Sequence, residues 1–451
     1  QTAYAAINTL RLDDLRPHIL RTHDSGKTWL EIVSGIPANE NVNAVREDPV
    51  RRGLLFASTE RAVYVSFDDG DHWQSLRLNM AASSVRDVII KADDLVAATH
   101  GRGFWILDDI TPLRQFDQKT ISADTVLFKP QTAIRVRWDM NTDTPLPPDF
   151  PAGENPPDGA VIDYYLQSAS PGPVTLEIKD SAGKTVRKYS SADKPDPVDP
   201  TLAIPTYWVR PPQTLSAAAG THRFLWDMHY PNVPGVEAAY PIAAIPHNTA
   251  PQPTGPWALP GKYTIVLTAN DKIYSQPLTI RMDPRVKTSP AGLQQQFKLS
   301  NDLYTQLLTL SPAGEQIVDV RKQLKDLQPR ATGEALTAIK ALDQKLQALA
   351  GGATRRPGPG TEPPTLGGLK TKFLTLFGVF QEADVAPSTQ AVAAVADLEK
   401  QLPPLMDRWN AVKAQDLPAL NKQLKDASLP ELKLESAGLP ARAVVSSKDE
   451  D

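Results

Sequence analysis

Two short segments of the chain place a carboxylate, a glycine and a tryptophan at the same spacing: THDSGKTW at residues 22–29 and SFDDGDHW at residues 66–73. The carboxylate could contact calcium or a glycan, or it could accept backbone N–H groups across a tight turn, as aspartate does in Asx turns. Because the glycine and the tryptophan recur with it, we predict a structural turn, in which glycine supplies a positive φ and tryptophan covers the hairpin. The residues shared by the two copies are Asp24, Gly26 and Trp29, and Asp68, Gly70 and Trp73.

Further along the chain, a second group of polar and aromatic side chains falls within the ten residues 100–109. A histidine, an arginine and an aromatic ring at a strand end could bind a sugar or an anion, and two carboxylates could supply the acid and base of glycoside hydrolysis. The alternative is that the arginine and the second aspartate bond to neighbouring backbone and close the last structural unit. These candidate ligand-binding residues are His100, Arg102, Trp105, Asp108 and Asp109.

Several other chemistries have no motif here. The 451 residues include no cysteine, which removes disulfides, thiolate metal ligands and cysteine nucleophiles. No HExxH, P-loop, GxSxG or Rossmann pattern occurs. No motif sets out the arginine triad and tyrosine nucleophile of a sialidase. His23 and His72 occupy variable positions of the repeats, so we expect them to face solvent. We therefore predict no metal site and no cofactor, and we assign no catalytic residue.

The spacing of the repeats predicts the elements that hold them. Trp29 and Trp73 lie 44 residues apart, a period typical of β-propeller blades. A third, degenerate unit lacks the glycine and tryptophan and ends near residue 113, so residues 1–116 hold about two and a half blades, whereas a closed propeller has at least four. We therefore expect further N-terminal blades, either upstream or on another chain. The predicted strands are residues 2–7, 19–22, 54–58, 62–66, 85–90 and 94–99.

Residues 124–282 read as short strands separated by proline-rich loops. Roughly seven strands over this length suggest an immunoglobulin-like β-sandwich, with a hairpin turn at residues 180–183 and Trp226 in the core. The proline-rich loops include residues 144–157 and 231–260. The predicted strands are residues 161–166, 174–178, 185–189, 221–226, 261–268 and 278–280.

Residues 288–435 change to helical periodicity and predict a bundle of four or five antiparallel helices. Apolar faces occur within residues 293–307, 317–327, 336–349, 369–380 and 392–412, and Pro403-Pro404 is expected to break or kink the last helix. Residues 436–451 are expected to be disordered. The predicted fold class is therefore mainly β with an α-helical C-terminal region.

Beyond the two repeats, several motifs resemble those of one known group: the C-terminal part of large bacterial BNR-repeat, or Asp-box, propeller proteins of the glycosyl-hydrolase-like and sortilin-like type. The resemblance covers residues 1–282 well and the helical region weakly. It is carried by the repeats themselves and by REDP at 46–49, THGRGFWILDD at 99–109, GENPP at 153–157, YYL at 164–166, FLWD at 224–227 and PGKY at 260–263.

The resemblance implies a secreted, periplasmic or cell-envelope protein of roughly double this length, with a signal peptide ahead of many more blades. Members of the group are labelled glycoside hydrolases, but shared architecture does not fix activity. Two functions remain open. The protein could bind or process carbohydrate with catalytic residues mostly outside this chain, or it could be a non-catalytic, sortilin-like scaffold that binds a peptide or protein partner.

The overall charge argues against some other partners. The net charge is −4 and the isoelectric point is about 6.0, so no bulk basic field attracts nucleic acid or an anionic membrane. No apolar run of about 18 residues encodes a membrane span.

Overall fold

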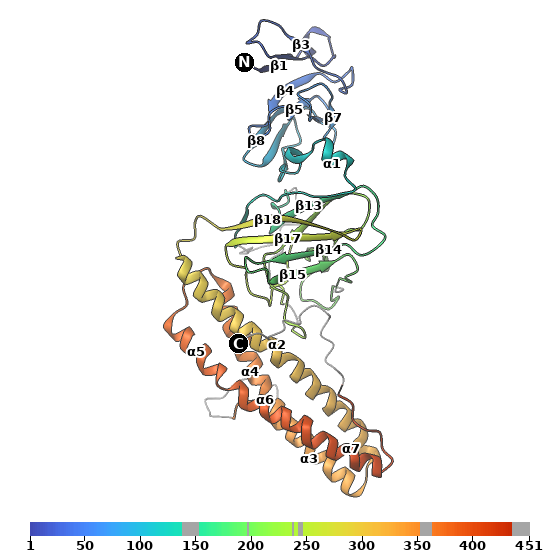
Figure 1. Cartoon of the computed structure of the whole chain (residues 1–451), viewed down its shortest axis with the longest axis vertical. Helices are drawn as coiled ribbons and strands as arrows, with labels where there is room; N and C mark the ends of the chain where they lie inside the picture. The colour runs from blue at the N-terminus through green and yellow to red at the C-terminus, as the bar shows by residue number, and fades with distance from the viewer. Residues whose placement is uncertain (138–152, 196–197, 237–238, 242–246, 352–362, 435–451) are drawn as a thin grey trace.

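The computed structural model describes residues 1–137, 153–195, 198–236, 239–241, 247–351 and 363–434. Figure 1 shows three parts in chain order along the long axis: small β-sheets at the N-terminal end, a larger two-sheet layer in the middle, and a helical bundle at the other end. The chain is therefore mixed, with many β-sheets followed by a helical C-terminal region, which confirms the predicted order of β and helical parts. Helices hold 31% and strands 25%, so the fold is not mainly β as predicted.

The N-terminal part consists of three antiparallel sheets that follow one another in sequence. Each of the six predicted strands is present to within a residue or two, and four further strands, β3, β4, β7 and β10, complete the sheets. The strands are β1 (Ala3–Ala6), β2 (Ile19–Thr22) and β3 (Leu30–Glu31); β4 (Val42–Glu47), β5 (Leu55–Thr59), β6 (Val63–Ser66) and β7 (Gln74–Ser75); and β8 (Val85–Lys91), β9 (Asp94–Thr99) and β10 (Phe104–Leu107).

The middle sheet buries both of its faces, since every residue of β5 and β6 is buried. One face, with Leu55 and Tyr64, shares a core with the first sheet. The other face, with Phe56 and Val65, shares a core with the third sheet. A strand that is buried on both faces needs apolar residues at successive positions. The runs LFA at 55–57 and VYV at 63–65 supply them. The three sheets therefore stack face to face.

The outer sheets each have one strand fewer than the middle sheet. The first repeat begins at the last residue of β2 and the second at the last residue of β6, so β1, β2 and β3 correspond to β5, β6 and β7. The first sheet therefore lacks an equivalent of β4. The third sheet, in the order β10-β9-β8, lacks an equivalent of β7. The described residues form three stacked sheets and no closed ring.

Two sheets form the middle layer and share one core around Trp226, which is fully buried as predicted. The predicted hairpin at residues 180–183 is present, with the Lys184 N–H donating to Oδ1 of Asp180 (2.9 Å). Two short strands, β11 and β12, were not predicted, and β18 is longer than predicted. The sheet orders are β11 (Thr125–Leu127), β13 (Ala160–Leu166), β16 (Gly220–Trp226), and β12 (Ala133–Arg135), β18 (Lys272–Met282), β17 (Gly261–Ala269), β14 (Thr175–Lys179), β15 (Thr185–Ser190).

The helical part begins with one helix of 38 residues, α2, which joins two apolar segments that the sequence suggested as separate faces. Pro312 lies inside α2 without ending it. Pro403 and Pro404 do not break a helix either, because they stand in the first turn of α6, where the missing proline N–H would have no helical partner. The helices are α2 (Pro290–Leu327), α3 (Gly333–Ala350), α4 (Leu366–Glu382), α5 (Thr389–Glu399), α6 (Leu402–Ala411) and α7 (Leu417–Asp426), and a π-helical segment (Val412–Asp416) joins the last two.

These helices pack around one core that includes Trp409 and Phe373. Within the described part of the chain, no helix is both long enough and apolar enough to span a membrane. The residues predicted to be disordered, 436–451, lie outside the described residues, as does much of the proline-rich loop at 144–157.

Candidate functional site

The two repeated turns have the same hydrogen bonds atom for atom. In the first, Thr22 Oγ1 donates to Oδ1 of Asp24 (2.8 Å) and accepts from the Gly26 N–H (2.9 Å), while the Thr28 N–H donates to Asp24 Oδ1 (2.9 Å). In the second, Ser66, Asp68, Gly70 and His72 make the same three bonds at 2.8, 2.9 and 2.9 Å. The aspartates therefore hold turns, as the sequence predicted.

The glycine is required at both turns by backbone conformation. Gly26 has φ of 86° and Gly70 has φ of 92°, in the region that side chains disfavour. At Gly70 the space is also closed, because a Cβ would lie 2.3 Å from Cδ1 of Ile32 in the neighbouring sheet. The second turn is thus fixed both by its own geometry and by the sheet packed against it.

The tryptophans of the two repeats differ in their surroundings. Trp73 is 4% exposed, lies in the core shared with the first sheet, and donates its indole N–H to the Ile32 carbonyl (2.9 Å). Trp29 is 46% exposed. Trp73 therefore packs on the preceding sheet. The described residues hold no sheet before the first one on which Trp29 could pack in the same way.

The carboxylates of the turns are occupied by these bonds. The Thr28 N–H and hydroxyl, with the Thr22 hydroxyl, lower the pKa of Asp24 to about 2. Its contribution to stability is therefore present above the ordinary pKa of 3.8 and lost as pH falls towards 2. Within the described residues, no three His, Cys, Asp or Glu side chains gather as metal ligands would. The carboxylates of Asp24 and Asp68 are thus engaged within their own turns.

The histidines of the repeats lie beside carboxylates instead of standing free. His72 Nδ1 is 2.7 Å from Oδ2 of Asp68, and His23 Nε2 is 2.9 Å from Oδ2 of Asp69. Both rings are more than half exposed. Their positions are consistent with the expected solvent-facing placement.

The second candidate group is spread along β10: His100 and Arg102 precede the strand, Trp105 lies within it, and the two aspartates follow it. His100 and Arg102 are exposed in the turn before the strand, and the Arg102 carbonyl accepts the indole N–H of Trp105 (3.1 Å). Asp108 and Asp109 follow the strand. A four-residue strand separates His100 and Arg102 from the carboxylates, so the structure does not bring the group together as one site.

Asp108 and Asp109 lie where the third sheet meets the β-sandwich. Arg223 of β16 donates to the carbonyl of Asp108 (2.7 Å) and to that of Asp109 (3.0 Å), and pairs with Asp163 (2.9 Å). Burial raises the pKa of Asp109, which accepts hydrogen bonds from the N–H and hydroxyl of Thr111. These contacts match the alternative in which the second aspartate bonds locally and closes the last unit.

A buried ionic group that the sequence did not predict joins the sandwich to the helices. Arg135 of β12 and Arg137 both pair with Asp384, which follows α4, and both guanidinium carbons lie 5.2 Å from the ring centre of Trp257. The Asp384 side chain is 2% exposed and that of Arg135 is 4% exposed. About 250 residues separate the arginines from the aspartate, so no local pattern reveals the pairing.

A histidine packs on the same tryptophan. The His229 ring centre lies 3.9 Å from that of Trp257, and Nδ1 bonds the Asp227 carbonyl at 2.7 Å. Burial lowers the pKa of His229, so the ring is neutral at neutral pH. A groove of about 580 Å³ borders the ion pair, lined by residues such as Arg137, Thr288 and Asp384. Because the buried arginines of the sandwich pair with an aspartate of the helical part, this region joins the sandwich to the helical bundle.

No known family model matches this sequence, and no curated protein is significantly similar to it.

Proposed function

We propose that this chain contributes the closing blades of an Asp-box β-propeller and that the completed propeller works by binding carbohydrate, with any catalytic residues on other blades. The observation that carries the proposal is the different exposure of two equivalent tryptophans. Trp73 is covered by the sheet before it, whereas Trp29, at the equivalent position of the first repeat, is 46% exposed. A further sheet stacked in front of the first would cover Trp29 as the first sheet covers Trp73.

The third sheet supports the same arrangement from the other end. Ile106 pairs with Val96 and Val96 with Ile89, so these side chains share one face, and Phe104 lies on it one pair further along. Ile89, Ile106 and Phe104 are 46%, 57% and 77% exposed. An exposed apolar sheet face marks an interaction surface, and a neighbouring blade would bury this one.

The carboxylates favour binding over catalysis by these residues. Glycoside hydrolysis needs two carboxyl groups about 5–10 Å apart on either side of the substrate. Asp24 and Asp68 hold turns, and Asp109 lies at the joint with the sandwich. We therefore assign carbohydrate contact to the face of the completed ring and no hydrolytic role to these three aspartates.

A glycan array and turnover assays on polymeric glucans and sialosides test this proposal, using the chain with any blades encoded upstream. We expect binding that survives Asp68→Asn in a folded protein. The matched control is Asp397→Asn, an exposed aspartate of the helical part. Absence of binding and turnover on every glycan would reject the carbohydrate function.

A second candidate function is the binding of a peptide or protein partner, favoured by the free edge of β10. This strand pairs only with β9, so one side of its backbone has no strand partner among the described residues. An extended peptide can add a strand at such an edge. Ile106→Pro should abolish peptide capture and leave glycan binding intact. Ile106→Val keeps the backbone N–H at this position and serves as the control, which should preserve both.

A further inference from the structure

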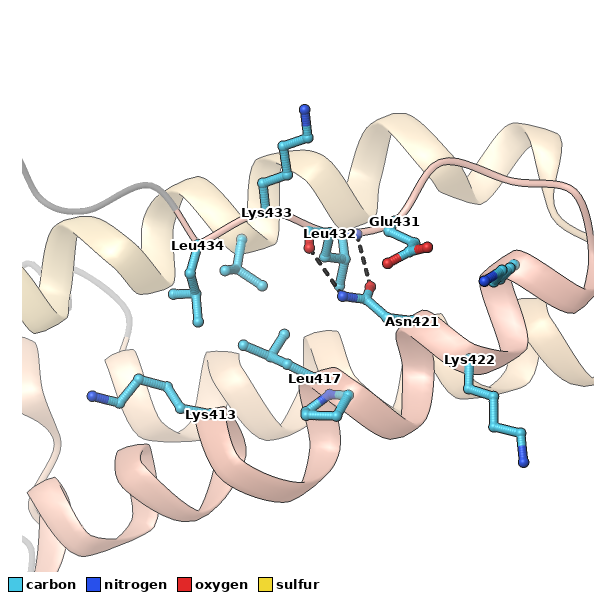
Figure 2. Close-up of a pocket in the computed structure, with 11 residues that line it drawn as sticks. Lys413, Leu417, Asn421, Lys422, Glu431, Leu432, Lys433 and Leu434 are labelled. Atoms are coloured by element: carbon cyan, nitrogen blue, oxygen red, sulfur yellow. Dashed lines mark hydrogen bonds between the residues drawn. The ribbon is translucent and has the colours of Figure 1, made fainter.

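The far end of the helical bundle carries a second groove, apart from the one at the Asp384 ion pair. It has a volume of about 540 Å³ and lies between α7, the π-helical segment and the extended chain after α7 (Figure 2). Its apolar lining includes Val320, Leu417 and Leu432, and Leu434 adds a side chain that is 39% exposed.

The groove has one wall made of extended backbone held by side-chain amides. Asn421 of α7 makes two hydrogen bonds to Leu432, accepting from its N–H (2.7 Å) and donating to its carbonyl (3.0 Å) (Figure 2). Gln323 of α2 does the same for Lys433, at 2.9 and 2.7 Å. Fixing two successive peptides in this way gives the groove a defined shape without help from a ligand.

The charged side chains around the groove have one predominant sign. Four lysines and one acid line it, so the lining carries a net charge of +3, in a chain whose net charge is −4. Lys413, Lys422 and Lys433 extend from different sides of the groove (Figure 2). The four lysines are Lys413, Lys422, Lys425 and Lys433, and the acid is Glu431.

These lysines lack ionic partners within the part of the chain that the structure describes. Lys413 lies over the ring of Trp409, at 5.6 Å from its centre, and the other three are exposed. Other lysines of the bundle do pair, as Lys345 does with Asp416 at 2.5 Å. The groove therefore concentrates positive charge that the described residues leave unneutralised.

We propose that this groove binds an acidic peptide segment of a partner protein, in which carboxylates meet the lysines and an apolar side chain enters between Leu417 and Leu434. Charge complementarity selects this occupant. Four ammonium groups that come from different sides suit several carboxylates along an extended chain, because each lysine is a flexible point charge. A ligand with one anionic group would need cations that converge on one point.

Fluorescence anisotropy of the full chain with the labelled peptide DELDDLED tests the proposal. We expect saturable binding that weakens at least tenfold between 50 and 500 mM salt, on the order expected for several exposed charge pairs. The variant K422E/K425E should bind at least tenfold more weakly. The matched control K340E/K372E makes the same charge change at exposed lysines of α3 and α4 outside the groove, and it should bind like the unmodified chain.

Two further arms test the apolar part and the partner class. The peptide DESDDSED, with serine in place of leucine, should bind at least threefold more weakly, and Leu434→Asp should weaken DELDDLED in the same way. Circular dichroism checks that each variant is folded. Phosphatidylserine vesicles, tested in parallel with the peptide, represent a membrane partner. The proposal is overturned if DELDDLED does not bind or if only the vesicles bind. It is also overturned if K422E/K425E and K340E/K372E lose affinity equally, or if DESDDSED binds as tightly as DELDDLED.

Discussion

Removal of the Asp384 carboxylate is expected to loosen the joint between the sandwich and the helical bundle. In Asp384→Ala, Arg135 and Arg137 would lose the only carboxylate that pairs with them among the described residues. Arg135 is almost fully buried and Trp257 covers both guanidinium groups, so water cannot replace the carboxylate without opening the structure. Breaking a buried ion pair by removing one partner destabilises by about 3–5 kcal/mol.

The structure also limits how that loss is compensated. Arg137 is 21% exposed and donates to the Gln381 carbonyl at the end of α4, where the helix dipole favours a cation. Burial lowers the pKa of Arg135, and the Asp384 carboxylate opposes that shift. Without the carboxylate, burial and the nearby charge of Arg137 would both act against the charged form of Arg135. The lower part of the range, about 3 kcal/mol, is therefore expected if Arg137 turns to solvent.

Hydrogen–deuterium exchange of amides in the last turn of α4 measures this opening directly, which is preferable to one unfolding curve for a chain of several parts. The expected loss of protection is about 100-fold to about 4,000-fold, since every 1.4 kcal/mol is a factor of ten. Asp397→Ala is the control, because the Asp397–Lys400 pair is more than 70% exposed on both sides and should change protection less than about threefold.

Replacement of both partners separates charge from packing. Asp384→Leu combined with Arg135→Met should recover most of the lost protection, since exchange of a buried ion pair for apolar side chains is often neutral or stabilising. If Asp384→Ala loses no more protection than Asp397→Ala, the carboxylate does not neutralise the buried arginines and the reasoning is refuted.

Three other perturbations follow from the contacts described above. Trp73→Ala should lower the free energy of unfolding of the N-terminal sheets by about 3–5 kcal/mol, whereas Trp29→Ala should cost less than about 1 kcal/mol; equal losses in urea titrations would contradict the difference in exposure. Asp68→Ala should cost about 1 kcal/mol through its lost turn bonds, seen as a lower urea midpoint, and an unchanged midpoint would count against a structural turn. Because burial lowers the pKa of His229, its neutral form stabilises the fold above about pH 6.5 and this contribution is lost as pH falls, by up to about 1.4 kcal/mol per pH unit. His229→Gln should flatten the stability profile between pH 6.5 and 5, and an equally steep profile would show that the ring is not responsible.

Local patterns predicted the elements well where their causes are local. The turn around Asp68 depends on residues within eight positions, so the repeat alone revealed both its hydrogen bonds and the need for Gly70. The strand boundaries of the N-terminal sheets follow from short apolar runs between turn residues. The core position of Trp226 likewise follows from its place at the apolar end of a predicted sandwich strand.

Other features escaped because a distant segment decides them. The apolar faces within residues 293–307 and 317–327 were predicted separately, yet α2 runs through both and through Pro312, since the helix packs along its length on the core of the bundle. The short strand β12 pairs in parallel with β18, about 145 residues later, and no local signal marks that partner. For the candidate group at residues 100–109, proximity in sequence suggested one site, but an extended strand carries its two ends apart.

The sequence by itself determined the repeated turns and the succession of β-rich and helical parts, because periodicity and turn chemistry act over a few residues. Only the tertiary structure decided that the middle sheet is covered on both faces while Trp29 is left exposed, that Arg135 and Arg137 share Asp384, and that lysines gather around one groove. Each of these depends on which distant segments come into contact. Burial and unpaired charge arise from those contacts, and no window of neighbouring residues contains them.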